Sequence, residues 1–184
     1  SLTARVTVNR YWQLIFGPCF VATANDFASH GTYPSHPQLL DHLALAFIDS
    51  GWNLRALLKA CVMSQTFRRD SNTTPEQLER DPHNVLLSRG PAMPMTAEML
   101  RDNALRAADL LSPQIGGASV DPGHPQKSKY RRSLYTNWKR NSPSPEMLIF
   151  GAPRRQVCTV QREKTLTPLQ PLVLMNSPQF VETA

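Results

Sequence analysis

Apolar residues recur at helical spacing through the first third of the chain. Residues 3–16 carry them at Val6, Val8, Trp12, Ile15 and Phe16, and Gly17-Pro18 supplies a stop. Residues 35–51 give the clearest pattern, with Leu39, Leu40, Leu43 and Phe47 on one face. Ser35 and Gln38 have the spacing of a capping box at the start of this second helix, and Gly51 closes it.

Polar start signals mark the elements that follow. Asn53 is a suitable N-cap for a third helix, whose apolar stripe is Leu54, Leu57, Leu58, Cys61 and Val62. Thr74 and Gln77 form a further capping box, and Thr96 begins a helix that Pro113 is expected to stop. Residues 112–130 are rich in Pro, Gly, Ser and Lys, which predicts an exposed loop.

The pattern changes after residue 130. Residues 132–137 and 157–160 alternate apolar and polar positions, which predicts a short extended pair. "SPEML" is a helical turn, Thr167 with Gln170 is a capping box, and Ser177-Pro178 starts a last helix. The fold class is therefore mainly α, a multi-helix domain with a small β element in the C-terminal third.

The chain of 184 residues suits a single domain, and its ends fall inside helical patterns, so we expect a fragment truncated at both ends. Three parts follow from the patterns: a helical part over 1–111, the exposed loop, and a basic part over 131–184. Residues 1–120 hold ten Lys/Arg and ten Asp/Glu, so the net charge of +6 comes from the remainder. A basic C-terminal third favours an acidic partner, which can be an acidic polysaccharide, a nucleic acid or an acidic protein, although a solvated surface explains it equally well.

The sequence lacks the motifs that several classes of cofactor and metal site require. Cys19, Cys61 and Cys158 form no CxxC or CxxCH pair, and no histidine cluster has the spacing of a metal site. We therefore expect no metal and no cofactor in this segment. No run approaches the roughly 20 apolar residues that a transmembrane segment needs.

Candidate catalytic residues are dispersed. Glu98 and Asp102 lie one helical turn apart and suit acid–base chemistry, but the simpler interpretation is helix-start and ion-pair roles. Cys158 lies near Arg154, Arg155 and Arg162, and cations lower a thiol pKa, although Cys158 can equally be a core residue. An enzyme would have to gather its site from separate segments. The candidates are Asp26, His36, Glu98, Asp102, Cys158 and Arg162.

Candidate binding residues combine rings with positive charge. Such a combination can stack on sugars or bases, and the same spacing suits a strand with one buried face. No recognised nucleic-acid motif accompanies these residues, so the sequence does not favour binding to nucleic acid. The candidates are Arg131, Arg132, Tyr135, Trp138, Lys139, Arg140, Arg154 and Arg155.

Six stretches occur in an order that resembles a known family. They are "VNRYWQLIFGPCFVATANDF", "PSHPQLLDHLALAFIDSGWNLRALLKACVMSQTFR", "DPHNVLL", "AEMLRD", "RRSLY" and "VCTVQREKTLTPLQPLVLMNSPQFV". This order resembles the planctomycete-specific domain of unknown function number 1553 across nearly the whole chain. The positions that match the family's polar signature are Asn9, Arg10, Asn25, Asp26, His36, Asp41, Asp81, Asn84, Glu98, Arg101, Asp102, Arg132, Tyr135, Cys158, Arg162, Thr167, Gln170 and Asn176. The chain departs from the family at Pro171, where a small residue is usual, and at Ser177, where an aspartate is usual.

The resemblance implies a context rather than an activity. Members of that family are typically the C-terminal part of large exported proteins, so the resemblance implies a periplasmic or otherwise extracytoplasmic location. It also implies upstream domains of the same polypeptide as partners, among them a cytochrome c-like module with c-type haem. The leading hypothesis is an accessory domain that binds or orients a redox module or an acidic glycan. The alternatives are an extracytoplasmic enzyme acting on carbohydrate and a purely structural domain.

Overall fold

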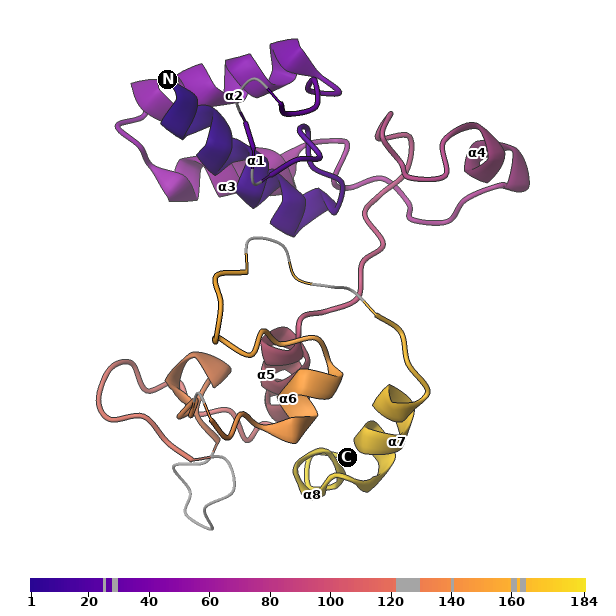
Figure 1. The fold of residues 1–184 in the computed structure, drawn as a ribbon. Coiled ribbons are helices and arrows are strands. Elements are labelled where there is room, and N and C mark those ends of the chain that lie inside the picture. Colours follow the sequence, from indigo (N-terminus) through magenta and orange to yellow (C-terminus); the bar gives the residue numbers. More distant parts are fainter. Residues whose placement is uncertain (25, 28–29, 122–129, 140, 160–161, 163–164) are drawn as a thin grey trace. The chain divides into compact units, whose positions relative to one another are not determined.

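The structure is a computed structural model of residues 1–184, and it describes all of them except 25, 28–29, 122–129, 140, 160–161 and 163–164 (Figure 1). The described residues form eight α-helices and a short 3₁₀ helix. They divide into two compact units, Ser1–Met93 and Pro94–Ala184. This boundary falls inside the segment 1–111, where the sequence pattern marks no domain boundary.

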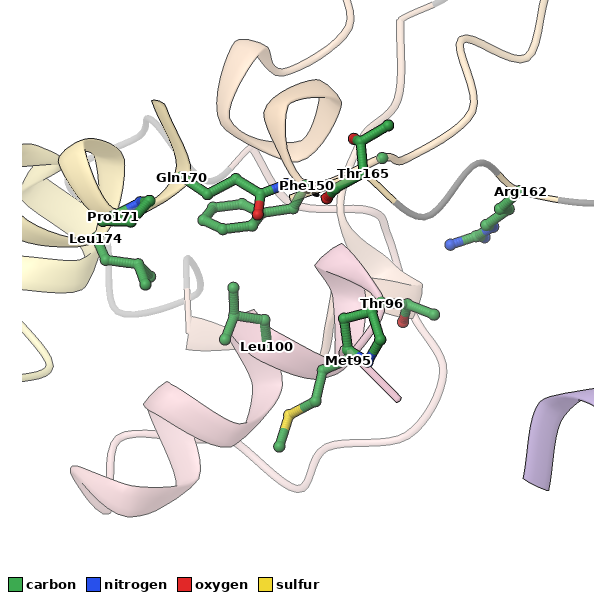
Figure 2. Close-up of a pocket in the computed structure, with 11 residues that line it drawn as sticks. Met95, Thr96, Leu100, Phe150, Arg162, Thr165, Gln170, Pro171 and Leu174 are labelled. Atoms are coloured by element: carbon green, nitrogen blue, oxygen red, sulfur yellow. Dashed lines mark hydrogen bonds between the residues drawn. The ribbon is translucent and has the colours of Figure 1, made fainter. Parts of the chain in front are cut away.

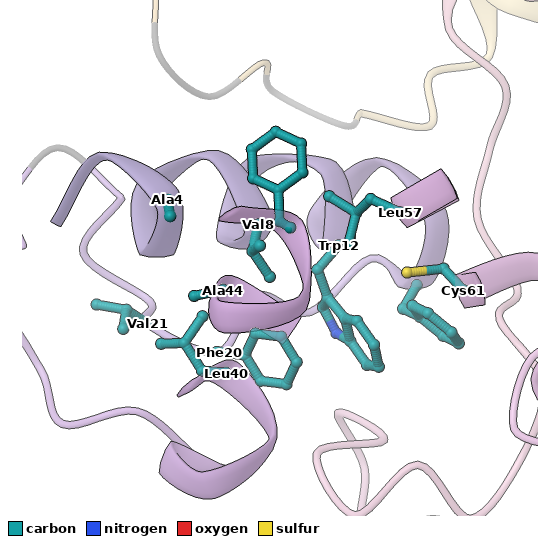
Figure 3. Close-up of a cluster of buried hydrophobic side chains, with 11 residues drawn as sticks. Ala4, Val8, Trp12, Phe20, Val21, Leu40, Ala44, Leu57 and Cys61 are labelled. Carbon is teal, nitrogen blue, oxygen red and sulfur yellow. The ribbon is translucent and has the colours of Figure 1, made fainter. Parts of the chain in front are cut away.

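Three helices build the core of the first unit: α1 (Leu2–Phe16), α2 (Pro37–Asp49) and α3 (Leu54–Met63). Figure 3 shows their apolar side chains converging on Trp12, whose ring stacks on Phe16 with centroids 3.9 Å apart. Leu40 and Leu57 reach the same core, as the hydrophobic pattern predicts. Each large side chain buried here contributes about 1.5–3 kcal/mol to folding.

Two of the three helix starts predicted in the first unit are confirmed. The Asn53 side chain accepts a hydrogen bond from Ala56 N–H at the start of α3. Thr74 and Gln77 form both bonds of the capping box at α4 (Pro75–Arg80). The box predicted at Ser35 and Gln38 is wrong, because α2 begins at Pro37 and His36 occupies the N-cap position without a side-chain cap. Gln38 is thus too close to the helix start to complete a box.

The second unit holds α5 (Ala97–Ala107), the 3₁₀ helix η2 (Ser133–Tyr135), α6 (Pro145–Ile149), α7 (Leu169–Asn176) and α8 (Pro178–Val181). Thr96 caps α5 by accepting from Met99 N–H, as predicted. The helix ends well before Pro113, because Asp109 adopts a left-handed φ of 55° just beyond it. A small cluster of Ala97, Met147 and Ala152 forms one core of this unit.

The predicted β element is wrong for the residues that the structure describes. Residues 133–135 form the helical turn η2, in which Tyr135 N–H donates to the Arg132 carbonyl. An isolated bridge joins Val120 to Thr136, but no strand forms among the described residues. Residues 157–159 have no regular structure, and Val160 lies outside the described residues. Over residues 132–137 the polar Ser133 is buried and the apolar Leu134 is 74% exposed, so burial does not follow the alternation that suggested a strand.

Candidate binding site

The centre of the second unit is a polar network that joins α5 to η2. Asp102 Oδ1 accepts the backbone N–H and the hydroxyl of Ser133, both at 2.7 Å. Arg101, the preceding residue, is 3% exposed and donates to the Arg131 carbonyl at 2.7 Å. Burial lowers the pKa of Arg101, and the carboxylates of Asp102 and Glu146 partly offset that effect. Asp102 therefore ties two segments together, and its Oδ1 is already engaged by Ser133.

Arg131 belongs to the same interior rather than to a surface. Its guanidinium donates to the carbonyls of Ala118, Gln114 and Gly116, and it lies 4.0 Å from the centroid of the Tyr135 ring. The residue is only 4% exposed. These bonds hold the loop before η2, so Arg131 and Tyr135 are placed for a structural task.

Glu98 and Arg162 are brought together from positions far apart in the sequence. Arg162 Nη1 donates to Glu98 Oε2 at 2.6 Å. Burial raises the pKa of Glu98, but the hydrogen bonds from Arg162, the Glu98 backbone and Thr96, together with the positive charge of Arg162, outweigh it, and the pKa lies below its ordinary value. Glu98 is thus an ion-pair partner that stays ionised at neutral pH, which does not suit a general acid.

Arg162 also lines a mainly apolar pocket of about 330 Å³ (Figure 2). Leu100 from α5, Phe150 after α6 and Leu174 from α7 form its apolar walls. Figure 2 shows Gln170 along one side of this pocket, and its amide donates to the carbonyls of Ile149 and Thr165. The capping box predicted at Thr167 is therefore wrong, because α7 begins at Leu169 and the Gln170 side chain is held by those two carbonyls.

Other residues of the family signature also bind backbone groups. Asn9 is fully buried, accepts from Val21 N–H at 3.0 Å and donates to the Val21 carbonyl. Asp81 accepts the N–H groups of Val85 and Leu86, and Asn84 bonds the N–H and carbonyl of Arg89. In both units, much of the signature fixes loops against helices.

The remaining candidate catalytic residues are divided between the two units. Asp26 and His36 belong to the first unit, where His36 contacts the Ser35 hydroxyl at 3.0 Å and the Phe20 ring. Cys158 is an exposed free thiol in the second unit. In the part of the chain that the structure describes, no group of three or more His, Cys, Asp or Glu side chains could hold a metal ion.

The cation of Arg155 contacts an aromatic ring of another segment, Trp138. The Arg155 guanidinium lies 4.9 Å from the centroid of the Trp138 ring, which brings residues 154–155 beside residues 138–139. We call Lys139, Arg154 and Arg155 the basic surface; all three are exposed. Among the residues that the structure describes, no ion pair engages them, whereas Arg132 lies 3.8 Å from Asp102. Arg140 lies outside the described residues.

Arg155 has an unusual backbone. Its φ of 59° is left-handed, which costs a residue other than glycine about 1–2 kcal/mol. An arginine stacked on an aromatic ring keeps the donors at the edge of its plane available, and these fit carboxylate or sulfate oxygens. Trp138 and Arg155 are both among the binding candidates of the sequence, but their spacing of 17 residues does not predict their contact.

One comparison with known proteins identifies the family. The family described as "Protein of unknown function (DUF1553)", PSD1, matches residues 1–184. The chain belongs to this family. No curated protein and no solved structure matches it. None of the helices in the described residues combines the length and apolar character that crossing a membrane requires.

Proposed function

We propose that the second unit of this DUF1553 domain binds an acidic polysaccharide through the basic surface. The observation that carries the proposal is the stacking of Arg155 on Trp138, which brings the segment of Arg154 and Arg155 against the residue that precedes the exposed Lys139. A polymer with repeated carboxylate or sulfate groups can engage several such cations at once. Each exposed pair contributes only about 0.2–1 kcal/mol, so the affinity has to come from their number.

A triple variant tests this surface against a matched control. Lys139→Ala/Arg154→Ala/Arg155→Ala removes three charges from the basic surface. Arg55→Ala/Lys59→Ala/Arg80→Ala removes three exposed charges from the first unit. Affinities for hyaluronan, polygalacturonate and uncharged dextran are measured at low and high salt by isothermal titration calorimetry.

We expect the acidic polymers, and not dextran, to bind the native chain and to weaken as salt rises, because salt screens exposed charges. The first variant should lose about tenfold in affinity, since the three pairs together supply about 1.4 kcal/mol or more. The control should lose much less. Binding that ignores salt, or equal losses in both variants, would refute the basic surface as the site.

We also propose that the domain works outside the cytoplasm as an accessory part of a longer polypeptide that carries a cytochrome c-like module. The support is the family resemblance alone. The mass and visible absorption spectrum of the native polypeptide test it: a c-type haem band on a much larger protein is expected. A small, colourless native protein would contradict this context while leaving polysaccharide binding to be judged by its own test.

The second candidate is a purely structural domain. It is favoured by the signature residues Asn9, Asp81, Asn84, Asp102 and Gln170, all of which bond backbone groups. This function predicts no polysaccharide binding at any salt concentration. The enzyme hypothesis stays a prediction. Two of its candidate residues, Glu98 and Arg162, are in contact, but they form an ion pair with each other.

A further inference from the structure

A second, larger cleft of the second unit lies beside the basic surface. Its volume is about 760 Å³, within the range of about 300–1,000 Å³ that is typical of ligand sites. Residues around η2 and α6 line one part of it, and α8 with the residues next to it lines another. Lys139 belongs to both the cleft and the basic surface. A polymer on the basic surface can therefore continue into the cleft.

The lining offers hydrogen-bonding groups of every kind. Asp121, Glu146 and Glu182 provide carboxylates, while Lys139 and Arg101 provide cationic donors. Asn137 and Gln179 add amides, each of which donates and accepts. Tyr130, Trp138 and Phe150 contribute aromatic rings to the same lining.

Part of this lining is fixed in place. Ser177, which is 8% exposed, donates its hydroxyl to Glu146 at 2.5 Å. Tyr130 donates its hydroxyl to Glu182. Arg101 is 3% exposed and is held by the Arg131 carbonyl. A site with orienting bonds behind its polar groups loses less entropy on binding than a set of mobile surface side chains.

The charge of the lining disfavours an anion inside the cleft. Three carboxylates face two cations there, so a phosphate or sulfate group would meet net repulsion. An uncharged sugar ring fits better, because each hydroxyl both donates and accepts while its C–H faces pack on aromatic rings. The cleft is also large enough to hold more than one such ring.

We infer that this cleft holds an uncharged sugar of the polysaccharide whose acidic groups occupy the basic surface. The inference rests on the proposed function and narrows it to polymers in which charged and uncharged sugars alternate. Hyaluronan, with alternating glucuronate and N-acetylglucosamine, is the probe of this class. Inorganic polyphosphate carries the charge without any sugar ring and serves as its counterpart.

The test compares both probes on the full chain. Asn137→Ala/Gln179→Ala removes two amides from the cleft without changing the net charge. Neither side chain makes a hydrogen bond to another residue that the structure describes. We expect hyaluronan affinity to fall about tenfold, from the loss of two hydrogen bonds, and polyphosphate affinity to stay unchanged. Circular dichroism and thermal unfolding of the variant verify that its fold is intact.

The other outcomes separate the two proposals. If polyphosphate binds as tightly as hyaluronan and the cleft variant changes neither, the basic surface stands and the sugar site in the cleft is overturned. An equal loss for both probes would also overturn it, because the effect would then lie on the charged surface. If neither probe binds the native chain, both proposals fail.

Discussion

Asp102 Oδ1 accepts two hydrogen bonds from one residue, Ser133, at 2.7 Å each. The two residues are 31 positions apart, so this contact fixes η2 against α5. The Ser133 hydroxyl also lies 3.3 Å from the Glu98 carbonyl, so Ser133 contacts two residues of α5. The contact is therefore one of the long-range constraints on the second unit.

Replacing Asp102 should destabilise this unit. Asp102→Asn keeps an oxygen that can accept from Ser133 but removes the negative charge, which strengthens both bonds and lies 3.7 Å from the buried Arg101 guanidinium. We expect a loss of about 2–3 kcal/mol in unfolding free energy, as for hydrogen bonds to charged groups. Asp109→Asn, at a side chain that is 94% exposed, is the control and should change stability by less than about 0.5 kcal/mol. Urea unfolding followed by circular dichroism measures both, and equal stabilities would contradict the structural role.

Replacing a buried asparagine should destabilise the first unit to a similar extent. Asn9→Ala leaves the N–H and carbonyl of Val21 without their side-chain partner in a fully buried place. The cost should be about 1–3 kcal/mol, since unsatisfied buried groups are expensive. Arg10→Ala, at the next and exposed position of α1, is the matched control and should be nearly neutral. Thermal unfolding that shifts equally in both variants would show that Asn9 has no special part.

The helix caps and the two buried polar contacts differ in how far along the chain their partners lie, and this difference explains what the sequence could predict. Asn53, Thr74 and Thr96 each accept from an N–H group three residues further on, so local spacing was enough to identify them as caps. Asn9 and Asp102 act on partners 12 and 31 positions away, and spacing carries no such information. The apolar stripes of α1, α2 and α3 were predictable for the same reason as the caps, because helical periodicity is local.

The candidate site shows the same limit. Arg131 resembles a surface cation in the sequence, yet its donors are used by loop carbonyls. The alternation over 132–137 resembles a strand, although η2 forms because Asp102 binds Ser133 from another helix. Glu146 and the cleft around it were not predicted, since no motif marks either. The residues that line the cleft come together only in the folded chain.

Acid should weaken the contact between Glu98 and Arg162. The pKa of Glu98 is lowered in the folded chain, so the unfolded chain binds more protons at acidic pH. The resulting stability is complete above the unfolded value, about 4.3, and is lost as the pH falls through the lower folded pKa. Because Arg162 is 38% exposed, the contribution should be about 1 kcal/mol or less.

Glu98→Gln tests this dependence. Its stability relative to the native chain should be lower at pH 7 and should converge as the pH approaches 3. Unfolding in urea across that range gives the difference at each pH. A difference that stays constant with pH would show that Glu98 acts through packing rather than through its charge.

The three thiols should react at different rates. Burial raises the pKa of Cys61, and it also raises that of Cys19, where a backbone hydrogen bond partly offsets it. Raised pKa values leave less thiolate at neutral pH, and burial slows access to both sulfur atoms. Cys158 is exposed, so maleimide should label it first in the native chain.

Mass spectrometry of digested samples after short labelling identifies the site, and Cys158→Ser should remove the fast phase. Labelling of Cys61 at the rate of Cys158 would show that the α1–α3 core opens readily, which the packing of Cys61 against Leu57 and Trp12 does not suggest.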